Sequence, residues 1–329
     1  LVHTQSLVTQ IKNDLENAGI KYGEWTGSKK KKDRIMVATV QAFSNALKKD
    51  SSWTYFFHCV FPDEAHHCNN LTGQYGFVLQ NLAAPIKIGL TATLPETKKG
   101  LMYIEALLGP VIARFSVKEA IDKGVLSKPL IRIVRGFHPP VTEMDDESDV
   151  PIPENRVKDP DYRPTKYATI YWNGIVTNVN RNIEVLAAAE RRYKQRKSIL
   201  INVIRHEHVN FLMELAKDYF PNMEVHSVTG HDTDERKEQI KADFKIKKIK
   251  CLVATNVFNE GINIKSLDCC INAASGKGSI GVMQKLGRAI RKTARKTTME
   301  YVDFEDKGVK YLHDHYKKRM ATLRKEGLL

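Results

Sequence analysis

The chain has 329 residues, of which 42% are hydrophobic and 27% charged, and its formal net charge at pH 7 is +14. That size suffices for about two domains, and the composition is typical of a soluble globular protein, with no apolar run near the roughly 20 residues that cross a membrane. The excess of Lys and Arg favours a polyanion partner, nucleic acid first, although basic solubility alone would also explain it.

The five cysteines argue against a disulfide framework or a zinc module, because they are odd in number and contain no CxxC pair. Cys269 and Cys270 are adjacent in an apolar run, so we expect them in the core. With no visible signal peptide, this usage indicates a reducing compartment. We expect the protein in the cytoplasm.

The first residues predict a strand end that runs into a helix over residues 7–18, with Gly19 as its stop. Because a domain rarely begins inside such a unit, we expect further sequence upstream of Leu1. Residues 29–34 are a charge run typical of a solvated loop. Residues 35–40 predict a strand, and Gln41 lies at the opening of the next helix.

Two further strands end in polar motifs. A buried strand over residues 53–61 is followed by Asp63-Glu64-Ala65-His66, and a strand over 86–90 is followed by Thr91-Ala92-Thr93. Strands that alternate with helices predict a parallel α/β sheet. In such a sheet, ligands bind at the carboxyl edge of the strands.

Asp63 and Glu64 are therefore candidate catalytic residues at that edge. Asp63 would hold Mg²⁺ through water, because hard cations prefer oxygen ligands. Glu64 would orient or deprotonate an attacking water. The alternative is a helix N-terminus, where acidic side chains favour the helix dipole.

The second half predicts another α/β unit after a Pro-rich and acidic stretch at 138–164, which we interpret as a linker or surface insertion. Helices are expected at 182–194, 212–219, 234–244, 282–293 and 310–325, and strands at 198–203, 225–228, 251–254, 269–272 and 299–304. His206 and His208 just after the first of these strands suggest a loop face. The last helix is basic and carries Lys317, Lys318, Arg319, Arg324 and Lys325.

A phosphate-gripping face is predicted on the helix at 282–293. Gln284, Arg288 and Arg291 are spaced i, i+4 and i+7, so they share one face. Guanidinium groups grip phosphate, and an arginine presented to a γ-phosphate stabilises the transition-state charge. A solvated basic helix is the alternative.

The order of these short motifs resembles that of the superfamily 2 helicases, from residue 4 to about residue 304. Seven stretches of the chain look like family motifs. In order they are Thr4-Gln5 (motif Ia), Thr39-Val40-Gln41 (Ic), Asp63 to His66 (II), Thr91 to Thr93 (III), Thr229-Gly230 (IVa), Thr255 with Glu260-Gly261 (V), and Gln284 to Arg291 (VI). Within the superfamily the chain looks most like UvsW-type phage recombination and branch-migration helicases, mainly over 200–304. Motors of the RecG and type III restriction kinds are poorer fits.

The resemblance implies two RecA-like domains, each a mostly parallel sheet flanked by helices, with ATP in the cleft between them. It places domain 1 at 1–135, a linker or insertion at 136–180, domain 2 at 181–305 and a basic C-terminal helix at 306–329. It also implies ATP and Mg²⁺ as cofactors and a nucleic-acid strand lying across both domains.

Individual roles follow from the resemblance. His66, Thr91 and Thr93 would couple the ATP site to the nucleic acid. Glu260 and Gly261 would line the ATP cleft with Asn263, which stands where the family often has Asp. Arg288 and Arg291 would be arginine fingers, and Gln284 would position water or phosphate. The sugar-phosphate backbone would be contacted by hydroxyls, amides and helix N-termini, at Thr4, Gln5, Thr39, Gln41, Thr229 and Thr255. Arg205, His206 and Gly230 are further candidate contacts to the nucleic acid.

The sequence thus predicts an ATP-dependent helicase or translocase that acts on duplex or branched DNA in recombination, repair or replication-fork processing. No Gly-x-x-x-x-Gly-Lys-Ser/Thr loop occurs in the sequence. The resemblance places that loop upstream of Leu1. Two alternatives stay open: an RNA helicase of the same superfamily, and a motor-derived nucleic-acid-binding module without its own ATP turnover. Translocation polarity, preferred junction and oligomeric state stay open as well.

Overall fold

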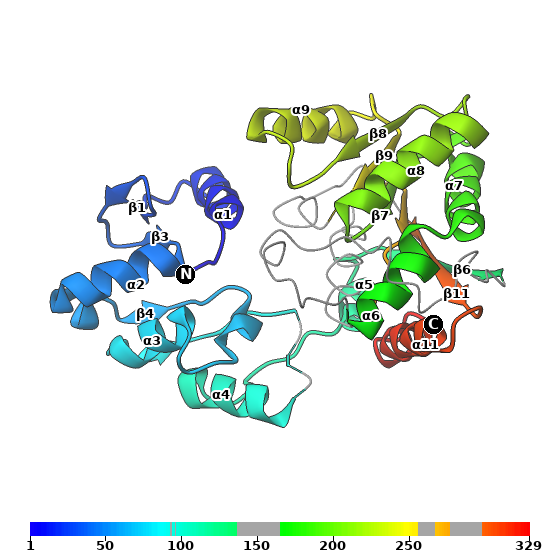
Figure 1. Cartoon of the computed structure of the whole chain (residues 1–329). Helices are drawn as coiled ribbons and strands as arrows, with labels where there is room; N and C mark the ends of the chain where they lie inside the picture. The colour runs from blue at the N-terminus through cyan, green and yellow to red at the C-terminus, as the bar shows by residue number, and fades with distance from the viewer. Residues whose placement is uncertain (93, 96, 137–164, 256–266, 277–297) are drawn as a thin grey trace, which may run out of the picture. The chain divides into compact units, whose positions relative to one another are not determined.

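The computed structural model describes all residues except 93, 96, 137–164, 256–266 and 277–297, and these described residues form two compact units (Figure 1). The units are Leu1–Arg114 and Phe115–Leu329. The sequence had placed the end of the first domain near residue 135. Residues just before that point instead belong to the second unit, because β6 (Lys128–Gly136) pairs over its whole length with the last strand of the second sheet.

The first unit is built on short strands that run parallel, apart from one edge strand. β1 (Gly23–Trp25) pairs antiparallel with β2 (Lys30–Lys31) and parallel with β3 (Met36–Ala38). β4 (Cys59–Val60) pairs parallel with β5 (Ile86–Lys87). Residues 1 and 2 join the two groups, since Val2 forms a parallel bridge with Thr39 and the Asp63 amide donates to the Leu1 carbonyl at 2.9 Å. The carboxyl ends of these strands therefore meet at one edge.

Trp53 lies in the core of the first unit, where several aromatic side chains pack around its ring. Its side chain is 2% exposed and meets the rings of Trp25 and Phe43 edge-on at 4.8 and 5.4 Å. The predicted strand over 53–61 is wrong for most of its length, because Ser51–Tyr55 form a 3-10 turn, η1, and only Cys59–Val60 are strand. Trp53 contacts Phe56 and Phe57 at the helical spacings of three and four, which the period of a strand would not allow.

The other elements of the first unit cover this core. The helices are α1 (Gln5–Asn17), α2 (Val40–Lys49), α3 (Gln74–Asn81) and α4 (Lys98–Leu108), with a 3-10 turn η2 (Ala65–Cys68). Gly19 ends α1 in the left-handed region at φ 68°, as the sequence predicted.

The second unit is built on a six-stranded sheet in the order β6-β11-β10-β7-β9-β8. Besides β6, its strands are β7 (Ile199–Asn202), β8 (Val225–Val228), β9 (Cys251–Ala254), β10 (Cys269–Asn272) and β11 (Thr298–Asp306). Every neighbouring pair is parallel. The strands β7, β9 and β10 are buried at every position, which explains why they are apolar runs rather than alternating patterns. The predicted α/β fold is confirmed.

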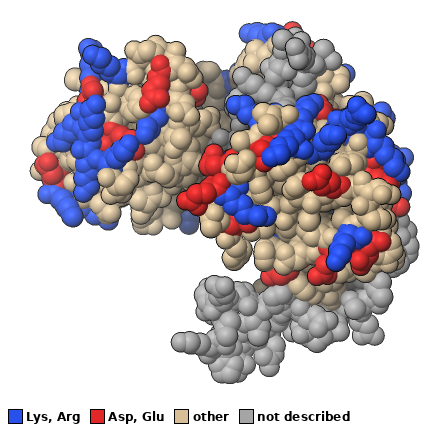
Figure 2. All heavy atoms as spheres, turned by 90° about the horizontal axis from the view of Figure 1, so that it is seen from above, with Lys and Arg blue, Asp and Glu red and all other residues tan. Residues whose placement is uncertain are grey.

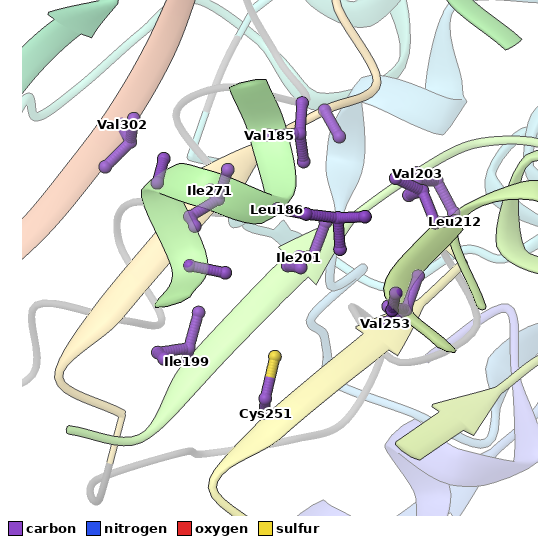
Figure 3. Close-up of a cluster of buried hydrophobic side chains, with 14 of the residues drawn as sticks. Val185, Leu186, Ile199, Ile201, Val203, Leu212, Cys251, Val253, Ile271 and Val302 are labelled. Carbon is purple, nitrogen blue, oxygen red and sulfur yellow. The ribbon is translucent and has the colours of Figure 1, made fainter. Parts of the chain in front are cut away.

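Helices cover both faces of this sheet. They are α5 (Val117–Asp122), α6 (Lys166–Tyr171), α7 (Val179–Tyr193), α8 (His206–Tyr219), α9 (Asp234–Lys245) and α11 (Lys310–Lys325), with a π-helical turn η4 (Trp172–Val176) after α6. Val185 and Leu186 of α7 and Leu212 of α8 pack on Ile201 and Val253 on one face (Figure 3). On the other face, side chains of α5, α9 and α11 form a second core.

Two fully buried arginines tie the end of β10 to its neighbours. Arg181 of α7 pairs with Asp306 at 2.7 Å and donates to the Ala273 carbonyl at 3.0 Å. Arg319 of α11 pairs with Asp303 at 2.9 Å and donates to the carbonyls of residues 275 and 276 at 3.0 and 2.8 Å. The sequence had grouped Arg319 with the basic side chains of the last helix, yet here it is an interior hydrogen-bond donor.

All five cysteines lie within the described residues and are free thiols, and Cys269 and Cys270 are buried as predicted. None of the described helices combines the length and the apolar character that a membrane crossing requires. Lys and Arg side chains occur in several groups on the visible face, interspersed with acidic ones (Figure 2).

Candidate functional site

Asp63 and Glu64 lie where the chain leaves β4. Backbone bonds to Leu90 hold them on both sides: the Leu90 amide donates to the Pro62 carbonyl at 2.9 Å, and the Ala65 amide donates to the Leu90 carbonyl at 2.8 Å. Asp63 also accepts the Glu64 amide on Oδ1 at 3.0 Å. Glu64 has φ 52° and ψ 51°, a left-handed conformation that residues other than glycine rarely adopt and that recurs at functional sites.

His66 connects the carboxylate of Glu64 to the neighbouring strand end. Its Nδ1 lies 3.3 Å from Glu64 Oε2 and 3.2 Å from Thr91 Oγ1. The side chains of His66 and Glu64 are only 13% and 18% exposed, so this contact is shielded from water. The structure therefore brings together two motifs that are 25 residues apart in the sequence.

Gly89 permits this close approach of the two strand ends. A Cβ on Gly89 would lie 2.8 Å from the Ala65 Cβ and 2.6 Å from Leu108 Cδ1, both closer than side chains pack. Glycine is the residue that fits where backbones approach this closely. The sequence gave no signal for Gly89, because its role depends on contacts distant along the chain.

A row of histidine rings lies beside this site. His67 contacts the rings of His3 and His66 at centroid distances of 4.4 and 4.3 Å and stacks on Tyr75 at 6.4 Å. Burial, followed by the proximity of His66 and His3, lowers the pKa of His67 to about 4, so this ring is neutral at pH 7. The sequence analysis missed His3 and His67 as neighbours of the site.

The described residues contain no group of three or more His, Cys, Asp or Glu side chains that could hold a metal ion by themselves. Asp63 still fits Mg²⁺, which typically uses one or two carboxylates, water and substrate phosphates rather than a cage of protein ligands.

The nucleic-acid candidates of the first unit stand at two helix N-termini. Thr4 caps α1 by accepting the Leu7 amide at 3.4 Å, and Thr39 caps α2 by accepting the Ala42 amide at 3.4 Å. Gln41 donates from Nε2 to the His3 carbonyl at 3.3 Å, which ties the two helix starts together. Gln5 is exposed next to Thr4. Thr39 is buried, so Gln5 and Gln41 are the exposed side chains at these two helix starts, and helix N-termini suit a phosphate backbone.

The candidates of the second unit gather at the carboxyl ends of β7, β9 and β8. Arg205 and His206 begin α8, and the His206 ring lies 4.8 Å from the ring of His231. The Thr255 amide donates to the Val228 carbonyl at 3.3 Å, which brings the ends of β8 and β9 together. His231, which follows Gly230, was missed by the sequence analysis, although it is exposed at the same edge.

Two details differ from what the sequence suggested. Thr229 is buried and uses its hydroxyl and amide on Asp232 Oδ2, at 3.1 and 2.7 Å, so Gly230 and His231 are the exposed groups of that turn. The loop face suggested for His206 and His208 is wrong, because both lie in the first turn of α8. His208 is fully buried and contacts Asn182 Oδ1 at 2.9 Å.

Seven predicted site residues lie outside the described residues, and their roles stay predictions: Thr93, Glu260, Gly261, Asn263, Gln284, Arg288 and Arg291. The predicted place of ATP between the domains stays a prediction too.

Family models match both halves of the chain. Residues 179–293 match the helicase conserved C-terminal domain, and residues 1–96 match the res subunit of type III restriction enzymes. The chain belongs to the superfamily 2 helicases. Three curated helicase relatives are similar along most of its length.

The DNA 3'-5' translocase XPB2 of Sulfurisphaera tokodaii is 23% identical over 81% of this superfamily 2 chain and 63% of its own length. The ATP-dependent DNA helicase uvsW of Enterobacteria phage T4 is 23% identical over 98% of this chain and 62% of its own length. The putative ATP-dependent helicase IRC3 of Saccharomyces cerevisiae is 24% identical over 82% of this chain and 37% of its own. The chain thus spans less than two thirds of each relative.

Solved structures of other helicases share the fold. Dbp5 of S. cerevisiae, bound to RNA and ADP BeF3, has a TM-score of 0.60 at 14% identity, covering 100% of this chain and 75% of its own. The DUF1998 helicase MrfA, bound to DNA and AMPPNP, has a TM-score of 0.64 at 15% identity, covering 98% and 44%. This likeness shows that the helicase fold of two RecA-like domains is present.

Proposed function

We propose that the protein is an ATP-dependent nucleic-acid motor of the UvsW kind that moves on or unwinds duplex or branched DNA. Recombination, repair or replication-fork processing in a bacterial or phage-infected cell would be its setting. The observation that carries the proposal is the contact of His66 with both Glu64 and Thr91. In addition, two curated relatives are named as a DNA translocase and a DNA helicase.

In this proposal the two carboxylates at the end of β4 have different tasks. Asp63, anchored by its bond to the Glu64 amide, would hold Mg²⁺ through water. Bound Mg²⁺ supplies charge neutralisation at the phosphate oxygens. Glu64 would orient the attacking water and accept its proton, and the contact of its carboxylate with His66 at 3.3 Å holds the side chain in place.

Residues of the second half would complete the ATP site. Arg288 and Arg291 would stabilise the charge that develops on the phosphate in the transition state, with Gln284 positioning water or phosphate. Glu260, Gly261 and Asn263 would contribute to nucleotide binding.

His66 would pass the state of the ATP site to the nucleic acid. His66 contacts Glu64 on one side and Thr91 on the other. A change at Glu64 on hydrolysis would alter the first contact, and His66 would pass the change to Thr91 and to Thr93, which follows Thr91 in the sequence. The nucleic-acid backbone would bind at the helix starts of Thr4 and Thr39 and at Arg205 and Gly230. Groups of this kind recognise phosphate without reading bases.

An RNA helicase is the second candidate, because backbone contacts of this kind do not distinguish DNA from RNA. Only contacts to the 2′-hydroxyl group would do so. The third candidate is a binding module without its own turnover. It would bind nucleic acid through the same backbone contacts without hydrolysing ATP.

The test is single-turnover ATP hydrolysis by the protein with its full natural sequence, with DNA or RNA added. Glu64→Gln keeps the shape of the side chain and cannot accept a proton, so we expect it to bind ATP and lose nearly all turnover. Glu105→Gln on α4, an exposed position, is the matched control and should behave as wild type. A wild-type rate in Glu64→Gln would remove Glu64 from the mechanism. Hydrolysis absent from the wild type would favour the binding module.

A further inference from the structure

Two exposed tyrosines lie side by side on the second unit. Tyr167 of α6 and Tyr311 in the first turn of α11 have ring centroids 5.7 Å apart and are 38% and 43% exposed. Both rest on the ring of His315, at 5.6 and 4.7 Å, and His315 is 4% exposed. We call Tyr167 and Tyr311, with His315 beneath them, the tyrosine platform. Because a buried ring supports both tyrosines, their positions are set by packing rather than by solvent.

The platform lies at the carboxyl edge of the six-stranded sheet. Tyr171, one helical turn after Tyr167, donates its hydroxyl proton to the Ala274 carbonyl just beyond the end of β10, at 2.8 Å. Tyr311 opens the helix that follows β11, and α6 lies beside α11 (Figure 1). Parallel strands bring their carboxyl ends to one edge, so the platform shares this edge with the ends of β7, β9 and β8.

Arg205 connects the platform to the proposed backbone contacts. Its guanidinium lies 5.9 Å from the centroid of the Tyr171 ring, and Tyr171 in turn is 5.9 Å from Tyr167. Along the strand order, the edge thus presents aromatic rings beyond β11 and β10, a cation after β7, and the exposed turn at Gly230 after β8. A row of this kind can hold some nucleotides of one strand by their bases, at the rings, and neighbouring nucleotides by their phosphates, at the cation and the turn.

The charges around the platform favour the same occupant. Lys166 and Lys310 are exposed and directly precede the two tyrosines in the sequence. The acidic residue one turn further along α11, Asp314, is within 3.4 Å of Lys317, which offsets its charge. The surroundings of the platform are therefore basic, as a polyanion requires.

We propose that the tyrosine platform stacks unpaired bases of a single nucleic-acid strand whose phosphates bind at Arg205 and Gly230. This inference rests on the proposed nucleic-acid function and extends it from backbone contacts to the bases. Every base has a π-face, so stacking on exposed aromatic rings tolerates any sequence. Paired bases inside a duplex present no free face, so the platform would select the separated strand.

The test compares two oligonucleotides of equal length, oligo-dT and its abasic analogue, for binding to the full-length protein by fluorescence anisotropy. Stacking contributes about 1–3 kcal/mol per base, so Tyr311→Ala and Tyr167→Ala should each weaken oligo-dT binding by roughly 5-fold to 100-fold. Binding of the abasic strand should change little. Phe at either position keeps the ring and should keep wild-type affinity.

Tyr219→Ala is the matched control. Tyr219 is 57% exposed at the C-terminal end of α8, which returns to the other edge of the same sheet, so its loss should affect neither oligonucleotide. Thermal unfolding of every variant checks that the exposed substitutions leave the fold intact.

The outcomes separate this inference from the proposed function. If the alanine variants lose affinity equally for both oligonucleotides, or for neither, the platform does not stack bases and the inference is wrong, while salt-dependent binding by the wild type would still support the proposed nucleic-acid partner. If the wild type binds neither strand nor duplex, the proposed function itself fails and the platform proposal fails with it.

Discussion

The two units of the molecule place their functional residues by different physical means. In the first unit, short strands and a strained Glu64 bring His66 within hydrogen-bond distance of both Glu64 and Thr91. In the second unit, a wide sheet buried on both faces carries fully buried Arg–Asp pairs, and the candidate residues lie at strand ends. The comparison shows that one site depends on local backbone geometry and the other on the interior of its domain.

The largest effect is expected on the free energy of unfolding when a buried Arg–Asp pair of the second unit is broken. Arg319→Met keeps the side-chain volume but leaves Asp303 buried without its partner, so we expect a loss of about 3–5 kcal/mol in the free energy of unfolding. Lys318→Ala, on the exposed face of the same helix, should change it by less than about 0.5 kcal/mol. Urea titration with pulse proteolysis, scored on peptides of the second unit, measures both.

Adding Asp303→Asn to Arg319→Met removes the unpaired charge and should recover part of the loss. If Arg319→Met were as stable as Lys318→Ala, the second unit would not depend on its polar interior, and the contrast between the units would disappear.

The next effect in size is a pH dependence of the second unit that arises from His208; His67, whose pKa is lowered to about 4, gives a dependence of the same sign in the first unit. Burial, with the charge of Arg181 as a smaller cause, lowers the pKa of His208 to about 3. The folded pKa is below the ordinary value of 6.5, so the folded state binds fewer protons than the unfolded state between these pH values. Stability is therefore complete above pH 6.5 and falls as the pH drops toward 3, by up to roughly 1.4 kcal/mol per pH unit.

His208→Gln keeps a polar group near Asn182 and cannot titrate, so its stability should vary less between pH 6.5 and 4.5. The same urea titration at several pH values measures this. His226→Gln, a partly exposed residue on β8, is the control. Equal slopes for wild type and His208→Gln would contradict the assignment of His208 as a neutral core residue.

The sequence predicted most strands of the second unit because fully buried strands are mostly apolar, as at 251–254 and, apart from its last residue Asn272, at 269–272. It failed at 53–61 of the first unit, where aromatic packing around Trp53 favours a 3-10 turn over a strand. Motif residues such as Asp63 and His66 were recognisable because their order is specific. Arg319, His208 and His67 were not, since nothing in the sequence shows which polar residues a fold will bury.

The most direct test of the account is the nucleic-acid stimulation of ATP hydrolysis in His66→Ala. Because His66 contacts both Glu64 and Thr91, its loss should break the link between them, while the variant keeps basal hydrolysis and nucleic-acid binding. A hydrogen bond to a charged group contributes about 1.5–3 kcal/mol, so stimulation by DNA should fall by roughly 10-fold to 100-fold. ATP hydrolysis by the control variant His58→Ala, which lies ahead of β4 in the same unit, should be stimulated by DNA as strongly as that of the wild type. If His66→Ala were stimulated as strongly as the wild type, the contact would carry no signal and the central claim would be wrong.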